Sequence, residues 1–336
     1  MSIPTTRLGR TGLIVSRMAL GTMTFGLQTD APTSFQILDK ADEGGINFLD
    51  TADVYPLGGS VETAGRTETI IGQWLQSKGA GARNRFILAT KAANKVGPNP
   101  WDQGNSRKHL LDAIDASLKR LQTDYVDLYQ LHHDDRTTPL DESLEALDTI
   151  VRSGRARYIG VSNFLAYRLA RAIGRAELNR LTQLVSVQPR YSLLFREIER
   201  ELLPLADEAG LGVIPYNPLA GGLLTGKYKP GSAPEENTRF TLGSAGGMYQ
   251  DRYWNERSFA TVTQLHQLAD EAGVPLATLA VAWVMANPLI TAPLLGASRP
   301  EQLDATLAAA SYTLDAGLKQ RLDELTADYR KGDAPR

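Results

Sequence analysis

Three polar side chains end apolar runs at equal spacing in the first half of the chain. Asp50 ends "NFLD", Lys91 ends "RFILATK" and His132 ends "VDLYQLH", so neighbours in this series are 41 residues apart. Tyr55 follows Asp50 by five residues. If the three runs are strands of one parallel sheet, their carboxyl ends meet at the same edge. We therefore expect these four side chains to converge.

This set of residue types suits proton donation by a phenol. A free tyrosine, with a pKa of about 10, is a poor acid at neutral pH, and a nearby ammonium group lowers that pKa. We expect Lys91 to lower the pKa of Tyr55, Asp50 to keep Lys91 charged, and His132 to orient a carbonyl oxygen. A carbonyl that gains a proton while something adds to its carbon indicates hydride transfer, for which a nicotinamide is the expected donor.

Each of these residues also has a plainer explanation. Asp50 and Lys91 are compatible with a structural ion pair, His132 with a core histidine, and Tyr55 with a surface loop. Burying all of them together costs several kcal/mol unless they pair, and such costs are tolerated mainly at functional sites. A Schiff-base role for Lys91 needs a neutral amine, which Asp50 disfavours. The "HHDD" run at 132–135 suggests metal ligands, but adjacent strand residues point to opposite faces, so no metal is expected.

Eight short apolar runs alternate with longer segments of helical period along nearly the whole chain. The expected strands are at 17–22, 47–50, 85–91, 126–132, 157–163, 184–189, 212–218 and 290–296. Helical patterns lie between them, among them 106–122, 140–154 and 197–210. Such alternation predicts a parallel sheet covered by helices, and eight units fit a closed (β/α)8 TIM barrel of the α/β class. An open dinucleotide-binding sheet is disfavoured because no G-x-G-x-x-G follows a strand.

Length and composition fit one soluble domain covering residues 1–336. The 336 residues carry a net charge of −2 and no cysteine, which excludes disulfides and gives no field for nucleic acid or an anionic membrane. The uncharged segment 272–298 is cut by three prolines into a helix of about 13 residues, too short for a bilayer. We expect a cytoplasmic protein whose partner is a small molecule. The oligomeric state leaves no trace in the sequence.

Two segments outside the strand–helix alternation, residues 7–16 and 219–256, also have predicted roles. Residues 7–16 have two extended runs around Gly-Arg-Thr-Gly, typical of a hairpin that caps the amino-terminal end of the barrel. Residues 219–256 form a long insertion after the seventh strand. Loops of this length in compact domains are usually functional or disordered.

Several motifs in order resemble the aldo-keto reductases over essentially the full chain. They are "LGRTGLIVS", "GINFLDTADVY", "ATK" at 89–91, "DLYQLHHDD", "GVSNF", "VQPRYS", "IPYNPLAGGLLTGKY" and "GASRPEQL". "GTMTFG" at 21–26 further resembles the bacterial long-loop branch, similar to potassium-channel β-subunits. The resemblance implies NADPH-dependent reduction of an aldehyde or ketone, with NAD possible as cofactor. It places the catalytic tetrad on Asp50, Tyr55, Lys91 and His132.

The resemblance also implies the cofactor contacts. Ser162, Asn163 and Gln188 would hold the carboxamide, and Tyr216 would stack on the nicotinamide. The remaining contacts, mainly to the phosphates and adenosine, would come from Gly21, Thr22, Met23, Asp50, Asn217, Pro218, Leu219, Gly221, Gly222, Lys227, Arg239, Gly296, Ser298, Arg299 and Gln302. The chain departs from the family at the adenine end, where Ala305 and Thr306 replace the usual Glu-Asn pair.

The expected substrate pocket is formed by Met23, Phe25, Tyr55, Trp101, His132, His133 and Tyr191. Which carbonyl compound it takes is decided by the rim loops and is left open by the sequence. The alternative function is a cofactor-binding regulatory subunit with slow turnover, as in the channel β-subunits.

Overall fold

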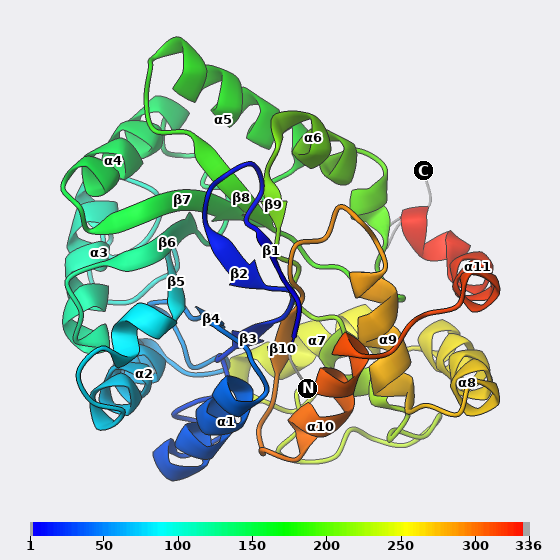
Figure 1. The fold of residues 1–336 in the computed structure, drawn as a ribbon. Helices are drawn as coiled ribbons and strands as arrows, with labels where there is room; N and C mark the ends of the chain where they lie inside the picture. The colour runs from blue at the N-terminus through cyan, green and yellow to red at the C-terminus, as the bar shows by residue number, and fades with distance from the viewer. Residues whose placement is uncertain (1–2, 332–336) are drawn as a thin grey trace.

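Eight parallel strands form one curled sheet with the order β10-β3-β4-β5-β6-β7-β8-β9 (Figure 1). The structure, a computed structural model, describes residues 3–331. The strands are β3 (Ala19–Gly21), β4 (Phe48–Asp50), β5 (Ile87–Ala92), β6 (Val126–Leu131), β7 (Ala156–Ser162), β8 (Leu184–Gln188), β9 (Gly212–Val213) and β10 (Leu294–Gly296). Val213 O accepts a hydrogen bond from Thr291 N at 2.8 Å. This bond joins β9 to the segment that leads into β10, so the two edges of the sheet meet. The expected (β/α)8 barrel is confirmed.

Helices surround this sheet (Figure 1). They are α1 (Ala31–Glu43), α2 (Arg66–Ser77), α3 (Arg107–Leu121), α4 (Leu140–Arg152), α5 (Ala166–Leu178), α6 (Leu202–Ala209), α7 (Gly246–Tyr253), α8 (Glu256–Glu271), α9 (Leu276–Met285), α10 (Gln302–Leu307) and α11 (Ala316–Leu325). Local chemistry sets several boundaries. The Ser106 side chain accepts a hydrogen bond from His109 N at the start of α3, and Asp30 caps α1 in the same way.

Two expected elements are shorter than the sequence pattern suggests. The run at 212–218 forms only the two-residue strand β9, because Pro215 has no N–H to continue the ladder. The run at 290–296 is a strand only over β10, after Pro293. The expected helix at 197–210 is a 3₁₀ turn, Glu197–Glu199, followed by α6.

The amino-terminal hairpin closes one end of the barrel. Its strands are β1 (Thr5–Arg7) and β2 (Ile14–Ser16), and in Figure 1 it lies across the middle of the barrel. Its buried side chains join a separate apolar cluster inside the barrel, formed by Leu8, Val15, Ala19, Phe48, Ala89, Leu128, Ile214, Ala292 and Leu294. The predicted cap is therefore confirmed.

Two residues further along the strands, the side chains that face the barrel interior change from apolar to polar. Successive strand residues alternate between faces, so the inward position after Phe48 is Asp50 and the one after Ala89 is Lys91. On β6 the residue two places after Leu128 is Gln130, which is paired with Lys91 in the β5–β6 register. An apolar layer thus lies beneath a polar layer at the carboxyl end.

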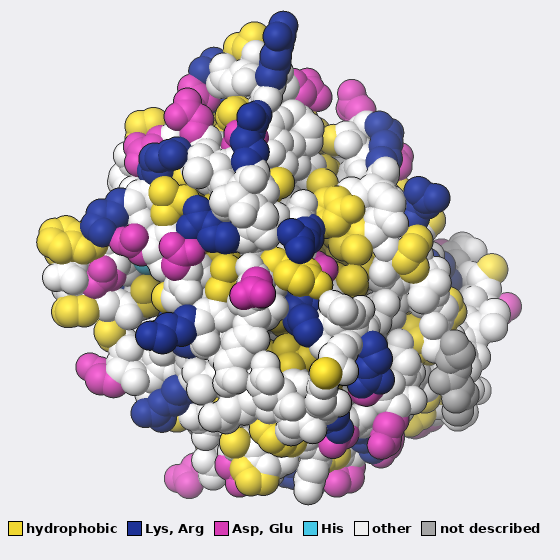
Figure 2. All heavy atoms as spheres, turned by 60° about the vertical axis from the view of Figure 1, so that its left-hand side comes forward, with side chains coloured by type: hydrophobic (Ala, Val, Ile, Leu, Met, Phe, Trp, Pro, Cys, Tyr) yellow, Lys and Arg dark blue, Asp and Glu magenta, His cyan; other side chains and the backbone are white. Residues whose placement is uncertain are grey.

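The long insertion after β9 contains regular secondary structure. It contains a 3₁₀ segment, Ala220–Thr225, another at Gly243–Ala245, and α7. Within residues 3–331 no single helix has the length and apolar composition of a membrane span; α8 and α9 pass only as a pair bent by 92°. Figure 2 shows Lys and Arg interspersed with Asp and Glu over the face nearest α3 and α4, as expected for a net charge of −2.

Candidate active site

Asp50 and Lys91 form a buried ion pair at the carboxyl end of the barrel. Lys91 Nζ donates to Asp50 Oδ1 at 2.5 Å and to the Thr51 carbonyl at 2.7 Å, and both charged side chains are almost completely buried. The second carboxylate oxygen of Asp50 accepts from Gln188 Nε2 at 2.8 Å and Gln130 Nε2 at 3.2 Å. Because removing one partner of such a pair leaves an uncompensated charge, this arrangement is held in place strongly.

Tyr55 and His132 meet above this pair. Lys91 Nζ lies 5.2 Å from the centroid of the Tyr55 ring. The centroids of the Tyr55 and His132 rings are 5.7 Å apart, and the ring planes are nearly perpendicular. His132 Nδ1 is 2.8 Å from Asn94 Nδ2, which holds the imidazole from the β5 side. All four expected catalytic side chains therefore lie together at one end of the barrel.

The pKa shifts in this group are dominated by burial. Burial lowers the pKa of His132 well below its ordinary value, and the neighbouring Lys91 charge lowers it further, so the imidazole is neutral at pH 7. Burial also lowers the pKa of Lys91, while Asp50 opposes that shift.

The expectation of a lowered pKa for Tyr55 is wrong in this structure. Burial raises the pKa of Tyr55 well above its ordinary value, and the Asp50 charge raises it further; Arg239 acts in the opposite direction. The physical reason is that burial of the phenol outweighs the nearby ammonium, and Lys91 is itself bonded to Asp50. Tyr55 is thus kept in its protonated form, which is the form that can donate.

The three residues expected to hold a carboxamide are linked to the tetrad by hydrogen bonds. Ser162 Oγ donates to the Gln188 carbonyl at 2.8 Å. Asn163 Nδ2 donates to the His132 carbonyl at 2.9 Å, and Tyr216 OH donates to Asn163 Oδ1 at 2.8 Å. Asn163 has a φ of 56°, a left-handed conformation that asparagine tolerates better than most residues. This turn follows β7 and fixes the side chain next to His132.

A cavity of about 1150 Å³ runs from the tetrad across the barrel mouth. Its wall includes Tyr55, His132 and His133, together with every residue expected to contact the cofactor: Gly21, Thr22, Met23, Asp50, Ser162, Asn163, Gln188, Tyr216, Asn217, Pro218, Leu219, Gly221, Gly222, Lys227, Arg239, Gly296, Ser298, Arg299 and Gln302. Ala305 and Thr306 lie on the same wall. The cavity is therefore long and is lined by residues from both ends of the chain.

Three residues expected in the substrate pocket lie elsewhere. Phe25 is fully buried among the side chains of the main core and is not part of the cavity wall. Trp101 is 50% exposed in the loop after β5 and is not part of the cavity wall. Tyr191 points outward from the barrel, where its hydroxyl donates to Glu199 Oε1 at 2.8 Å.

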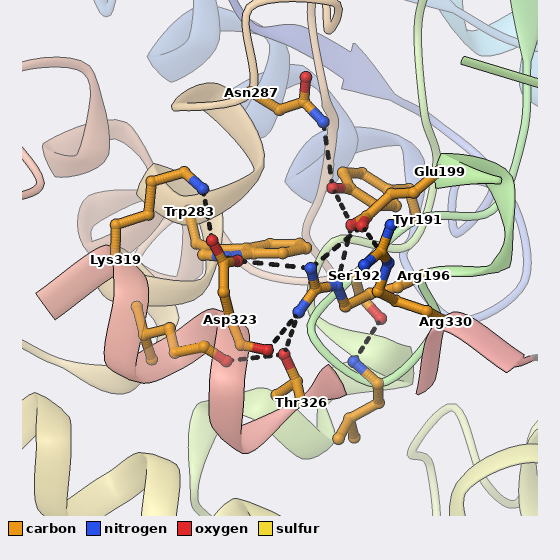
Figure 3. Close-up of polar contacts among 12 residues, drawn as sticks. Tyr191, Ser192, Arg196, Glu199, Trp283, Asn287, Lys319, Asp323, Thr326 and Arg330 are labelled. Carbon is orange, nitrogen blue, oxygen red and sulfur yellow. Dashed lines mark hydrogen bonds and ion pairs between the residues drawn. The ribbon is translucent and has the colours of Figure 1, made fainter. Parts of the chain in front are cut away.

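Tyr191 belongs to a separate polar cluster centred on Arg196 (Figure 3). Arg196 lies between Glu199 and Asp323, with nitrogen–oxygen distances of 2.8 and 3.5 Å, and it also donates to Thr326 Oγ1. This cluster ties the carboxyl-terminal helix α11 to the segment after β8. Its polar groups bond to one another, so its evident role is structural.

The sequence reading missed three polar residues at the site. Gln130 and Thr51 bond to the Asp50–Lys91 pair, and Asn94 bonds to His132. The signal for Gln130 was its position two residues before His132, on the same face of β6. Thr51 contributes only a backbone carbonyl, and Asn94 follows β5 in a loop whose path no local pattern reveals.

The chain was compared with known proteins. The model of the aldo/keto reductase family matches residues 17–327. The chain belongs to the aldo/keto reductase family. Like other members it is an oxidoreductase, and the family typically uses nicotinamide cofactors.

Several similar proteins align with nearly the whole length of this chain. An uncharacterized oxidoreductase, YrpG of Bacillus subtilis, is 44% identical over 95% of both chains. A probable voltage-gated potassium channel subunit beta of Arabidopsis thaliana is 37% identical over 90% of this chain and 89% of its own. The L-glyceraldehyde 3-phosphate reductase of Escherichia coli O157:H7 is 33% identical over 95% of this chain and 91% of its own.

Proposed function

We propose that this protein is an NADPH-dependent carbonyl reductase that converts an aldehyde or ketone to an alcohol, with Tyr55 as the proton donor. The observation that carries this proposal is the buried Asp50–Lys91 pair beneath Tyr55 and His132, at the floor of a long cavity. The similarity to an enzyme named as an L-glyceraldehyde 3-phosphate reductase supports carbonyl reduction. A cytoplasmic location fits this role.

In the proposed reaction each of the four side chains has a separate task. Neutral His132 donates a hydrogen bond to the carbonyl oxygen, and Asn94 keeps the ring oriented through Nδ1. Tyr55 gives its proton to the same oxygen as negative charge develops there. Lys91, aimed by Asp50, stabilises the phenolate that Tyr55 leaves behind.

The cavity fits a phosphorylated dinucleotide. Three cations on its wall, Lys227, Arg239 and Arg299, form no ion pair with a carboxylate of the described chain. Nη1 of Arg239 is buried and has no hydrogen-bond partner among the described residues, an arrangement that an anionic ligand would satisfy. Gly221 and Gly222 have φ values of 72° and 96°, which exposes their backbone to the cavity. A nicotinamide dinucleotide bound there would supply the hydride.

The preference for NADPH over NADH is proposed from Arg299. A guanidinium donates two parallel hydrogen bonds to a phosphate, which distinguishes the 2′-phosphate from a hydroxyl group. Gln302 is already engaged, because Ser298 N donates to its Oε1 at 2.8 Å. Ala305 and Thr306 add no long polar side chain, so the preference depends mainly on Arg299.

The test is Tyr55→Phe, assayed by NADPH oxidation with a simple aromatic aldehyde. Loss of the proton donor should lower kcat by about 10²- to 10⁴-fold while the Kd for NADPH changes little. Tyr125→Phe is the control, because Tyr125 precedes β6 at the opposite end of the barrel. Turnover retained in Tyr55→Phe would remove the role assigned to this residue.

A regulatory role is the second candidate, and the similarity to a probable potassium channel subunit beta favours it. The two functions differ in rate. Steady oxidation of NADPH over many turnovers supports the enzyme. Tight NADPH binding with no more than one turnover per chain supports the regulatory subunit.

A further inference from the structure

We propose that the natural substrate carries an anionic group, a carboxylate or a phosphate, and that Arg252 recognises it. This inference rests on the proposed function, because it names the substrate class of the same site. It arises from an excess of positive charge in the cavity wall. Two cations there, Lys95 and Arg252, remain after those suited to the dinucleotide phosphates have been assigned.

Arg252 lacks the carboxylate partner that several other buried or half-buried arginines of this protein have. Arg83, Arg168 and Arg196 each bond to a carboxylate at 2.7 or 2.8 Å. Arg252 is half-buried and, among the described residues, has no hydrogen bond or ion pair. Its place in the last turn of α7 is favourable with respect to the helix dipole. That effect explains a cation at this helix end but not why it faces the cavity.

Arg252 lines the same cavity as Tyr55, His132 and Tyr216. The next residue, Tyr253, accepts a hydrogen bond from Asn217 Nδ2 at 2.8 Å, which holds α7 against the segment that carries Tyr216. The Arg252 charge also lowers the pKa of the Tyr216 phenol, which burial raises. Tyr216 bonds to Asn163, and Asn163 bonds to the backbone of His132. Arg252 therefore lies on a helix that is tied to the segment of Tyr216, next to the group that orients the carbonyl.

Lys95 adds a second positive charge on the β5 side, at an exposed position. It follows Asn94, whose side chain is 2.8 Å from His132 Nδ1, and among the described residues it has no ion pair. The carboxylates on the cavity wall do not offset these charges. Asp50 is paired with Lys91. The others are exposed, Glu235 and Glu236 in the insertion after β9 and Glu301 directly before α10.

A guanidinium group such as that of Arg252 selects ligands that carry a carboxylate or a phosphate. Its planar fork matches a carboxylate or phosphate with two charge-assisted hydrogen bonds, which are about twice as strong as neutral ones. A substrate that carries such a group a few bonds from its carbonyl would be held at both ends, by Arg252 and by His132 with Tyr55. A neutral aldehyde would be held only at the carbonyl.

The experiment compares matched substrates in the NADPH-loaded protein. Pairs of similar shape are 4-carboxybenzaldehyde with 4-methylbenzaldehyde, and glyceraldehyde 3-phosphate with glyceraldehyde. We expect kcat/KM to favour at least one anionic member by about tenfold or more. Arg252→Gln should remove most of this preference and leave the neutral member within about twofold. Arg252→Lys, which keeps the charge, should retain part of it.

Two controls separate Arg252 from the cofactor and from general charge. Arg257→Gln removes a cation from α8, outside the cavity, and should leave the preference unchanged. The Kd for NADPH, measured by fluorescence titration, should be the same in Arg252→Gln and wild type. Binding of 4-(hydroxymethyl)benzoate to the NADP-loaded protein, measured by calorimetry, should weaken in Arg252→Gln.

The inference is overturned by any of three results: no preference for either anionic substrate in the wild type, an equal loss for both members of a pair in Arg252→Gln, or a loss of NADPH affinity in place of substrate preference. These failures differ from a failure of the proposed function. In that case the neutral aldehydes would also not be reduced by the wild type, or Tyr55→Phe would reduce them normally.

Discussion

The two ends of the barrel interior are built from the same strands but hold opposite kinds of side chain. At the amino end Phe48, Ala89 and Leu128 pack under the hairpin with no polar side chain among the members of their cluster. Two residues later Asp50, Lys91 and Gln130 form a hydrogen-bonded layer. One strand therefore provides stability at one end and chemistry at the other. The difference shows why a buried strand of this protein ends on a carboxylate.

The largest expected effect comes from breaking the polar layer. Lys91→Met leaves Asp50 buried without its counter-charge, which should lower the free energy of unfolding by about 3–5 kcal/mol. It also removes the ammonium next to Tyr55, so kcat should fall by about 10²- to 10⁴-fold. Urea unfolding and NADPH oxidation measure the two effects. Lys108→Met, which removes an exposed ion pair with Asp112, should change stability by less than about 1 kcal/mol.

Breaking the apolar layer should affect stability alone. Phe48→Ala opens a cavity beneath the hairpin and should lower the free energy of unfolding by about 3–5 kcal/mol. Under conditions where the variant is still folded, the Kd for NADPH should be close to that of the wild type. Leu178→Ala, at a 70% exposed position, is the control that should unfold like the wild type. A selective loss of turnover in Phe48→Ala would show that the two layers are not separate in function.

A smaller effect on the free energy of unfolding is expected from Asp53, a buried carboxyl group near the site. Asp53 is buried, and within residues 3–331 neither of its carboxylate oxygens has a hydrogen-bond partner. Burial together with the Glu68 charge raises its pKa well above the ordinary value of 3.8. The folded state thus binds a proton more tightly than the unfolded state. The resulting stability is present below pH 3.8 and is lost as pH rises through the folded pKa.

Asp53→Asn removes this titration without changing the shape of the side chain. The variant should be more stable than the wild type at neutral pH, and the difference in unfolding free energy should shrink as pH falls toward 3.8. Urea unfolding at a series of pH values measures it. A difference that is constant with pH would mean that Asp53 is not the group that titrates.

The barrel and the tetrad follow from local patterns in the sequence. Apolar runs ending on Asp50, Lys91 and His132 at equal spacing are enough to place them at one rim, because parallel strands share a direction. Residues fixed by the path of a loop were harder to place. Tyr191 and Trp101 follow strands yet lie away from the cavity wall, and the pKa of Tyr55 depends on how deeply the folded chain buries the phenol. Such features depend on tertiary contacts that no local period encodes.

The most direct test of the polar layer's function is a single-turnover measurement. NADPH-loaded wild type and Tyr55→Phe are mixed with saturating aldehyde, and the rate of NADPH consumption is followed, which removes binding and product release from the comparison. We expect the variant to be slower by about 10²-fold or more, since only the proton donor has been removed. Equal rates in the two proteins would contradict proton donation by Tyr55 and with it the assigned chemistry of the carboxyl end of the barrel.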